Sequence, residues 1–395
     1  MRTIYTALQL PTNGGNICVN FWGVATYSSE QQHPRQQTRM MTQEDGDYVN
    51  DTYEYMDYEY VEETKAGGYT QREALHIISV IIYSLAFTLG VIGNGMVIWV
   101  TAFKSKRTVN SIWLQNLAIA DFVFVLFLPF SIDYVLRDFH WLFGKTMCKL
   151  NSFVCTMNMY ASVLFLTVLS LDRYISLVHL NWSERYRNIR RAWWVCALIW
   201  ITSCCLSCPA LIFRDVIQHN GKVVCFNNFH DESKHMVAVR HIAMVSLRTV
   251  VGFLLPFATI TISGVLLAIK MRQSNLVRLT SFSRTVSAVI LAFFLCWVPF
   301  HTFSLMELSM HHTTYLHSVL IVGFPLATSL AFFNSCVNPI LYVLLTKKVR
   351  KLVRRSCLNF TKSSLRELSQ SVSATELDSA LPSSSPEETT ANSSV

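Results

Sequence analysis

The sequence predicts an all-α membrane protein, a bundle of seven transmembrane helices followed by a short amphipathic C-terminal helix. Of its 395 residues, 51% are hydrophobic and 15% are charged, whereas soluble chains carry about 25% charged residues. Seven stretches are also apolar over the roughly 20 residues that a helix needs to cross the hydrocarbon core. Each must be a helix, because lipid cannot satisfy exposed backbone amides.

The expected spans occupy residues 74–345 and leave long segments at both ends of the chain. Residues 1–73 form the N-terminal segment, residues 346–357 the amphipathic helix on the membrane surface, and residues 358–395 the tail. The seven spans run from Ala74 to Phe103, Asn110 to Arg137, Lys145 to Val178, Ala192 to Phe213, Arg240 to Met271, Ser283 to Leu308 and Leu316 to Leu345.

Basic residues gather in alternate connections between the spans and set the expected orientation. The net charge of +8 alone would suit nucleic-acid binding, but these residues flank separate spans instead of forming one patch. By the positive-inside rule, the loops that carry them are cytoplasmic. We therefore expect a multi-pass plasma-membrane protein with an extracellular N-terminus, a cytoplasmic C-terminus and no nucleic-acid partner. The clusters lie at Lys104–Arg107, Arg185–Arg191, Lys270–Arg284 and Lys347–Arg355.

An acidic, tyrosine-rich stretch at residues 44–63 marks the N-terminal segment. Nothing in it can form a core, so we expect residues 1–73 to be a disordered extracellular segment. The stretch either solubilises the chain or, with its tyrosines sulfated, attracts a cationic protein ligand. Asn50 begins an Asn-Asp-Thr sequon here and is the expected glycosylation site. Met40 and Met41 directly precede the stretch and are a second candidate start of translation.

The C-terminal segment carries signals for the inner membrane surface and for regulation. Basic residues alternate with Val349, Leu352 and Val353, which suits a helix over 346–357 that lies on the inner leaflet of the lipid bilayer. Cys357 at its end is the expected palmitoylation site. Residues 358–395 are rich in Ser and Thr, and we expect a disordered tail that receptor kinases phosphorylate and arrestin then binds.

Two cysteines lie where a disulfide can form. Cys148 begins the third span on the outer side, and Cys225 lies in the outer loop after the fourth span. Both face the oxidising compartment, so we expect them to be bridged. The cysteines inside the spans are interpreted as small core residues, and they are too scattered for a zinc site built from CxxC pairs.

Polar residues and prolines recur inside the apolar spans, and their order along the chain is specific. The motifs are Gly93-Asn94, Leu117-Ala118-Ile119-Ala120-Asp121, Asp172-Arg173-Tyr174, Trp200, Pro256, Cys296-Trp297-Val298-Pro299 and Asn338-Pro339-Ile340-Leu341-Tyr342. With these motifs on successive helices, residues 74–357 resemble the rhodopsin-like G protein-coupled receptors. The resemblance implies a receptor, not an enzyme, that passes an extracellular signal to a heterotrimeric G protein.

Asp121 places a carboxylate in the middle of the second span, where a charge without a partner is costly. We therefore expect it to face the bundle. The resemblance implies that it holds an allosteric sodium ion through oxygen ligands, which suit a hard cation. The alternative is a hydrated polar network without a specific ion, and no other cofactor is expected. The implied sodium ligands are Asp121, Asn158, Ser162, Asn334 and Asn338.

The resemblance also implies an activation switch. Arg173 is held by Asp172 through a charge-assisted contact at rest, and it meets the G protein when it is released. Trp297 and Phe293 form a packing switch below the ligand. The alternatives are a structural ion pair and ordinary aromatic core. The implied switch residues are Asp172, Arg173, Tyr174, Phe293, Trp297, Asn338, Pro339 and Tyr342.

Gly264 is a departure from the family pattern. It stands eight residues after Pro256, where the family has a tyrosine whose hydroxyl supports the active state. We therefore expect weak or biased G protein signalling. An atypical receptor that binds and internalises its ligand with little G protein output stays open as an alternative.

Several stretches narrow the resemblance to the chemerin receptors, also called chemokine-like receptors, and somewhat more to the second than to the first. They are residues 139–144, Phe213-Arg214-Asp215, residues 225–229, and Glu307-Leu308 with His311-His312. The second receptor typically has histidine where this chain has Arg173, so the subtype stays open. The resemblance implies a peptide or protein chemoattractant or adipokine as ligand, with chemerin as the leading candidate, and a Gi-type G protein.

Arg248, two turns outward from Pro256, is the most informative residue of the expected pocket. An unpaired guanidinium would be costly to bury there, so an internal acid or a ligand carboxylate must pair with it. We favour the ligand, and the resemblance implies that its carboxylate is the C-terminus of a peptide. A carboxylate lipid mediator is the alternative. The expected ligand-binding residues are Arg248, Glu307, Asp133, Tyr134, Trp141, Phe226 and Asn227.

Overall fold

A computed structural model describes most of the chain between residues 65 and 345. The described residues are 16–19, 25–28, 65–219, 221–229, 234–273, 281–308, 314–345, 362, 363, 365, 366 and 369. The expected acidic stretch at 44–63, the surface helix at 346–357, and the modification sites Asn50 and Cys357 lie outside these residues. Residues 1–341 form one compact unit and residues 342–395 a second, and the first contains the bundle.

Within the described residues, seven helical segments are long and apolar enough to cross a membrane, which confirms the predicted fold class. A short helix, α5 (Leu180–Tyr186), connects the third segment to the fourth. The seven segments are α1 (Lys65–Trp99) with η2 (Val100–Lys104); α2 (Val109–Val125) with α3 (Leu128–Leu136); α4 (Gly144–Val178); α6 (Ile189–Phe213); α7 (Lys234–Thr249) with η3 (Val250–Leu254) and α8 (Leu255–Gln273); α9 (Ser281–Leu308); and α10 (Thr314–Leu345).

Two of these segments begin at N-cap residues that the sequence supplies. Thr108 caps α2 through a capping box with Ser111, in which each side chain bonds the other residue's backbone N–H at 3.2 and 2.8 Å. Asn188 caps α6, because its side-chain oxygen accepts a hydrogen bond from the Arg191 N–H at 2.9 Å. These caps satisfy backbone donors that would otherwise have no intrahelical partner.

The second and fifth segments are not continuous α-helices. Pro129 stands in the first turn of α3 and has no backbone N–H, so the helix is interrupted between α2 and α3. The fifth segment contains the π-helical turn η3 just before Pro256. Such turns re-aim the residues on either side of them, and they often lie at functional sites.

The N-terminal region differs from the sequence expectation. Helix α1 begins at Lys65, earlier than the expected Ala74. Within the segment expected to be disordered, β1 (Asn16–Val19) and β2 (Ala25–Ser28) form an antiparallel pair. Neither feature follows from the membrane requirement, which constrains the apolar part of α1 alone.

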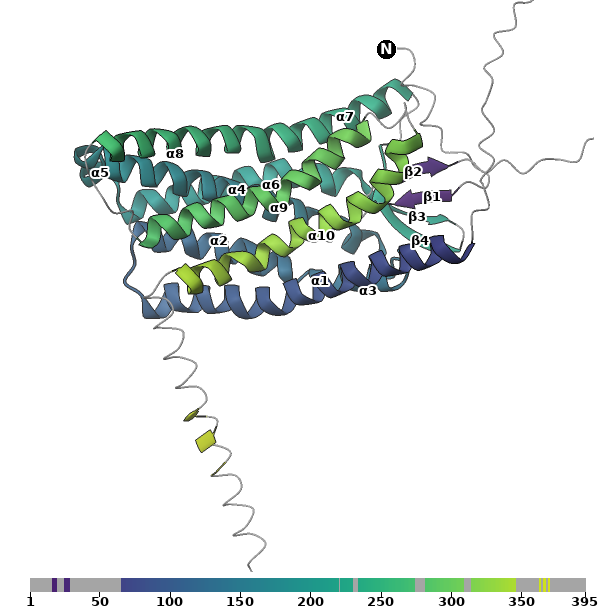
Figure 1. The fold of residues 1–395 in the computed structure, drawn as a ribbon, viewed down its shortest axis with the longest axis horizontal. Coiled ribbons are helices and arrows are strands. Elements are labelled where there is room, and N and C mark those ends of the chain that lie inside the picture. The colour runs from purple at the N-terminus through teal and green to yellow at the C-terminus, as the bar shows by residue number, and fades with distance from the viewer. Residues whose placement is uncertain are drawn as a thin grey trace, which may run out of the picture. The chain divides into compact units, whose positions relative to one another are not determined.

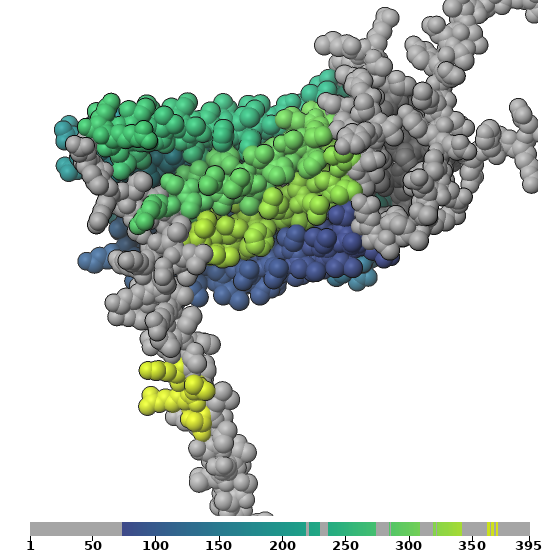
Figure 2. Space-filling model, in the orientation of Figure 1, coloured from purple at the N-terminus to yellow at the C-terminus, as the bar shows by residue number. Residues whose placement is uncertain are grey.

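Helix α4 is the centre of the bundle, and the long helices run along a common direction around it (Figure 1). It is joined to α8 by the Ser170 and Ser263 hydroxyls at 2.9 Å. Trp200 of α6 donates to the Asn116 side chain of α2 at 3.0 Å. Figure 2 shows α8, α9, α10 and α1 packed side by side on one face of the bundle.

Helices α1 and α10 approach closely at a glycine. A Cβ atom added to Gly93 would lie 2.7 Å from the Cβ of Pro339, which is closer than real Cβ atoms come. Nearby, the Asn94 side chain donates to the Ser335 backbone carbonyl at 2.8 Å. The Gly93-Asn94 motif therefore joins the first and last spans, through small size at one residue and a hydrogen bond at the next.

A β-hairpin covers one end of the bundle. Strand β3 (Arg214–His219) pairs antiparallel with β4 (Lys222–Asn227), and Val216 lies opposite Cys225. Gly221, in the turn between the strands, has a φ of 75°, which favours glycine. This hairpin follows α6 directly and so brings β3 and β4 over the adjacent ends of the helices (Figure 1).

Candidate functional site

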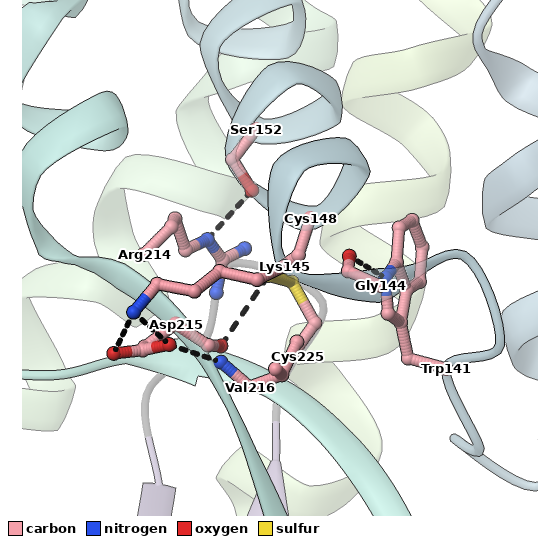
Figure 3. The surroundings of a disulfide bond; sticks show 9 residues. All are labelled: Trp141, Gly144, Lys145, Cys148, Ser152, Arg214, Asp215, Val216 and Cys225. Carbon is pink, nitrogen blue, oxygen red and sulfur yellow. Dashed lines mark hydrogen bonds and ion pairs between the residues drawn. A yellow bond between two sulfur atoms is a disulfide. The ribbon is translucent and has the colours of Figure 1, made fainter.

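The hairpin is fastened to helix α4, and we call this end of the bundle the disulfide end. Cys225 of β4 is bonded to Cys148 of α4, as the sequence predicts. Figure 3 shows the ion pair between Lys145 Nζ and Asp215, at 3.0 Å, beside this bond. Burial raises the pKa of Asp215, but hydrogen bonds from Lys145 and from the Val216 N–H outweigh it and hold the pKa below its usual value. The carboxylate is therefore ionised at neutral pH, and the ion pair persists.

Three residues expected in the ligand pocket lie in the core of the disulfide end. Tyr134 and Trp141 are buried against Cys148 and Cys225, with their ring centroids 5.5 Å apart. The Trp141 indole N–H donates to the Gly144 carbonyl at 2.8 Å (Figure 3). Phe226 is buried in β4. These side chains support the hairpin, and ligand contact would require them to move.

Asp133 is engaged within its own helix segment. Both of its carboxylate oxygens lie 2.9 Å from Arg137 Nε, four residues later. The pair is partly exposed, so it contributes little to stability. Because Arg137 balances the charge of Asp133, the attraction between Asp133 and a cationic group of a ligand is weaker.

A cavity of about 30 Å³ lies beneath the hairpin, and two arginines line it. Arg214 is the first residue of β3, and Arg248 lies near the end of α7. Their exposed fractions are 3% and 6%. Arg214 Nε donates to Ser152 Oγ at 2.6 Å (Figure 3), and Arg248 donates to Ser304 Oγ at 3.4 Å. The other lining residues are Thr156, Tyr160, Leu206, Pro209, Ala210, Asn227, Met244 and Leu247.

Arg214 is a functional candidate that the sequence reasoning missed. The stretch Phe213-Arg214-Asp215 contributes to the family resemblance, and an arginine directly after an apolar span also indicates a charge at the end of that helix. Burial lowers the pKa of Arg214 to about 10, and the neighbouring Arg248 acts in the same direction. The group still carries its proton at neutral pH, so the cavity holds two positive charges.

Glu307 is the one expected acid deep in this region. It is 4% exposed, and its carboxylate oxygens accept no hydrogen bond from any residue that the structure describes. It is close enough to Arg248 for electrostatic attraction. Two guanidinium groups, of Arg214 and Arg248, and the Glu307 carboxylate are thus buried in this part of the disulfide end.

An aromatic chain leads from Arg248 to the expected packing switch. The Arg248 guanidinium carbon lies 5.0 Å from the centroid of the Phe300 ring. Phe300 makes an edge contact with Trp297 at 5.6 Å, and Trp297 lies 5.9 Å from Phe293. All three aromatic residues are buried. The structure thus brings Arg248 and the aromatic residues of the expected switch into one continuous set of contacts.

Asp121 lies at the centre of the bundle and is completely buried. Its oxygens accept hydrogen bonds from Asn338 at 2.8 Å and from Ser162 at 3.4 Å. In the orientation of the Asn158 amide that exchanges its O and N atoms, Asn158 donates to Asp121 at 3.2 Å and accepts from Ser335 at 3.0 Å. Ser335 is a member of this network that sequence reasoning missed.

The network also contains amide oxygens that suit a cation. Among the described residues, Asn94, Asn334 and Asn338 each keep a buried side-chain oxygen that accepts no hydrogen bond. Carboxylate and amide oxygens are ligands that suit a hard cation better than a softer metal. Asp121, Asn158, Ser162 and Asn338 are brought together directly, and Asn334 is buried on the same helix as Asn338.

Arg173 lies at the opposite end of the bundle, which we call the Arg173 end. It is 3.5 Å from Asp172, but Arg187 is closer, at 2.7 and 3.0 Å from the two Asp172 oxygens. Both arginines also donate to the Asn110 side chain of α2. Tyr174 contacts the His179 ring instead, with centroids 5.6 Å apart. Arg187 and Asn110 are thus parts of the ionic contact that the Asp-Arg-Tyr motif does not reveal.

The Asn338-Pro339 part of the last motif faces the bundle interior, since both residues are buried. The Tyr342 side chain lies outside the described part of the structure.

Comparison with known proteins agrees with this arrangement. The family model of the 7 transmembrane receptor (rhodopsin family) matches residues 93–342. Chemerin-like receptor 2 of Macaca fascicularis is 43% identical over 327 residues, which are 82% of this chain and 92% of the relative. The Homo sapiens chemerin-like receptor 2 is 42% identical over 330 residues, 84% and 92% of the two chains. Chemerin-like receptor 1 of Rattus norvegicus is 41% identical over 312 residues, 75% and 83% of the two chains.

These similarities confirm the resemblance to the chemerin receptors, and the matches to the second receptor span more of this chain. The family consists of receptors and not of enzymes, and it implies a multi-pass plasma-membrane protein with an extracellular ligand and G protein coupling. The chain belongs to the rhodopsin family of seven-transmembrane receptors.

Proposed function

We propose that this receptor binds the C-terminus of a chemerin-like peptide or protein through Arg248 and Arg214. The observation that carries the proposal is that two buried guanidinium groups line one cavity. Buried cations need anionic partners, and Glu307 lies close enough to Arg248 to attract it. A ligand carboxylate would complete the balance and could accept the forked hydrogen bonds that guanidinium groups make.

The size of the cavity suits a small anionic group, such as the carboxylate at the end of a peptide chain. The cavity of about 30 Å³ has room for a small terminal group but not for a folded segment. Leu206, Pro209, Met244 and Leu247 supply an apolar wall for the preceding side chains of the ligand. The relatives are named chemerin-like receptors, which supports a chemerin-like ligand for this chain.

Binding requires the disulfide end to face outward, which is the orientation that the loop charges indicate. We propose that the N-terminus is extracellular and that the acidic stretch at 44–63 attracts a basic face of the ligand. The long-range part of that attraction would raise the association rate and would weaken with salt.

Signal transmission is proposed to run from Arg248 through Phe300 to Trp297 and on to the Arg173 end, where a Gi-type G protein and arrestin bind. Arrestin binding would follow phosphorylation of the tail by receptor kinases. A sodium ion held by Asp121, Asn158, Ser162, Asn334 and Asn338 would stabilise the resting arrangement, because it would supply the cation that the buried carboxylate and amide oxygens fit.

One observation supports an alternative ligand, and another supports an alternative signalling output. The apolar wall beside Arg248 would also accept a fatty-acid chain, so a carboxylate lipid mediator is the second candidate ligand. Gly264 lacks the side chain that supports the active state in the family, so a receptor that mainly internalises its ligand is the second candidate output.

A binding screen with parallel readouts separates these functions. Labelled chemerin C-terminal peptides and a long-chain fatty acid would be tested for binding to cells that express the receptor, with Gi activation and arrestin recruitment measured together. We expect saturable peptide binding that drives both readouts. Fatty-acid binding without peptide binding would contradict the proposal that the ligand is a peptide. Internalisation without any Gi response would contradict the proposal that the receptor signals through a G protein.

A further inference from the structure

A second cavity lies at the Arg173 end, between α4, α8 and α9. Its volume is about 300 Å³, which reaches the lower end of the roughly 300–1,000 Å³ of small-molecule sites. Its walls are mostly apolar, as such sites require. The apolar lining consists of Phe257, Ile260, Leu267, Val286, Ile290, Leu291 and Phe294, and the polar lining of Ser170, Arg173, Thr261, Ser263 and Ser287.

Gly264 leaves this space open. A Cβ atom added to Gly264 would meet no heavy atom of the described residues within 4 Å. By contrast, a Cβ added to Gly252 in the same span would lie 3.0 Å from a methionine side chain and 3.2 Å from a tyrosine ring. The backbone of α8 is thus held away from its neighbours at Gly264, and a side chain there would occupy the cavity.

The cavity opens sideways toward lipid. Ile260 and Ser263 at its base are buried, whereas Thr261, Gly264 and Leu291 at its mouth are exposed. All of them belong to the membrane-crossing segments Met236–Gln273 and Val286–Leu308, so the exposed side faces the bilayer. A molecule can therefore enter between α8 and α9 without crossing the aqueous phase.

The inner end of the cavity is positively charged. Arg173 lines it, and Arg173 shares the Asp172 carboxylate with Arg187. The Ser170 and Ser263 hydroxyls are less available to a bound molecule than Arg173 is. Ser263 donates to the Ile260 carbonyl at 3.0 Å, and the two hydroxyls are hydrogen-bonded to each other at 2.9 Å. Among the described residues, two guanidinium groups lie around the Asp172 carboxylate and place positive charge beside an apolar channel. The complement of that pattern is an anionic head on an apolar chain.

We propose that this cavity binds a single-chain amphiphile with a carboxylate head, a long-chain fatty acid drawn from the leaflet at the Arg173 end. The head lies toward Arg173, and the chain passes Gly264 and leaves between α8 and α9. This site is separate from the ligand cavity at the disulfide end, and it stands whether or not that cavity binds a peptide.

Photoaffinity labelling tests the site. The purified full-length receptor in lipid nanodiscs is exposed to palmitic acid that carries a diazirine on its chain, and labelled peptides are located by mass spectrometry. We expect the label to concentrate on peptides containing 257–267 and 286–294, and excess unlabelled palmitate to remove it. Gly264→Phe, which fills the space, should reduce this labelling about tenfold, whereas Gly264→Ala should not change it.

The methyl ester of the same probe tests the charge, because it keeps the chain and removes the anion. We expect it to label these peptides several-fold less than the acid does. Labelling spread evenly over all lipid-facing helices, or labelling that unlabelled palmitate does not displace, would overturn the site. Equal labelling by acid and ester would overturn the role of Arg173, and this comparison uses the unchanged receptor, so it does not depend on whether a variant folds.

Discussion

The guanidinium of Arg248 lies over the ring of Phe300, 5.0 Å from its centroid, and Phe300 in turn meets Trp297 edge-on. A cation over a buried aromatic face is attracted by about 0.5–2 kcal/mol. We propose that a ligand carboxylate draws the guanidinium away and that this contact changes first. In this proposal, the contact of Phe300 with Arg248 and Trp297 would convert an electrostatic change at Arg248 into a packing change at Trp297.

Phe300→Leu should separate binding from signalling. The substitution removes the ring but leaves Arg248, so we expect peptide affinity to change less than threefold or so, on the order of the smaller cation–π energies, while the maximal G protein response falls clearly. Phe332→Leu is the matched control, because Phe332 is equally buried but packs on Tyr83 and Phe124 away from Arg248. If both variants lose the same response in a G protein activation assay, Phe300 has no special role.

Asp121→Ala should abolish the effect of sodium on agonist affinity. The carboxylate is the charged member of a buried network whose amide oxygens fit a cation, and alanine removes that charge. Competition binding at fixed ionic strength, with sodium replaced by a bulky organic cation, measures the effect. Asp133→Ala is the control, because that carboxylate is bound by Arg137 at the partly exposed helix end. Sodium sensitivity that survives in Asp121→Ala would rule out the ion site.

Gly264→Tyr should strengthen G protein signalling. The space around this position accepts a side chain, and the added hydroxyl can make one hydrogen bond that favours the active state. One such bond contributes about 0.5–1.5 kcal/mol, so we expect roughly a 2- to 10-fold gain in agonist potency for G protein activation. Gly264→Phe fills the same space without the hydroxyl and should show no gain. An unchanged response in Gly264→Tyr would refute the link between this glycine and weak output.

Arg187→Ala and Asp172→Asn should change basal signalling in opposite directions. Arg187 holds Asp172 more closely than Arg173 does, so it competes with Arg173 for the carboxylate. Without Arg187, Asp172 can hold Arg173 more firmly, and basal G protein activity should fall. Loss of the Asp172 charge frees Arg173, and basal activity should rise. A rise in both variants, measured at equal surface expression, would show that Arg187 belongs to the restraint itself.

The membrane made most of the fold predictable. Lipid forces each apolar stretch into a helix, so the ends of the third and fourth spans were placed within a few residues, at Gly144–Val178 and Ile189–Phe213. Outside lipid that constraint disappears, and the early start of α1 and the β1–β2 pair were not expected. Pro129 has no backbone N–H, so a proline at this position inside an apolar span also predicts the break between α2 and α3.

Site residues could be predicted where a single residue is unusual in its sequence context. Their contact partners could not be predicted where those partners come from distant parts of the chain. Arg248 and Asp121 stood out because a charge inside a span is rare. Arg214 reaches the same cavity only because the hairpin folds back over the helices, and Arg187 reaches Asp172 only through the turn after α5. No local pattern encodes such contacts, so the sequence indicated the charges but not their neighbours.

Binding of one peptide in two forms to Arg248→Ala tests the ligand proposal most directly. A chemerin C-terminal peptide with a free carboxylate and its C-terminal amide would be compared in competition binding on the unchanged receptor, on Arg248→Ala and on Arg240→Ala. Arg240 is a matched arginine on the same helix that lies over the Phe213 ring. We predict that Arg248→Ala weakens the acid at least about 30-fold more than the amide, the ratio that roughly 2 kcal/mol produces, and that Arg240→Ala does not discriminate. Equal losses for acid and amide in Arg248→Ala would contradict direct recognition of the carboxylate.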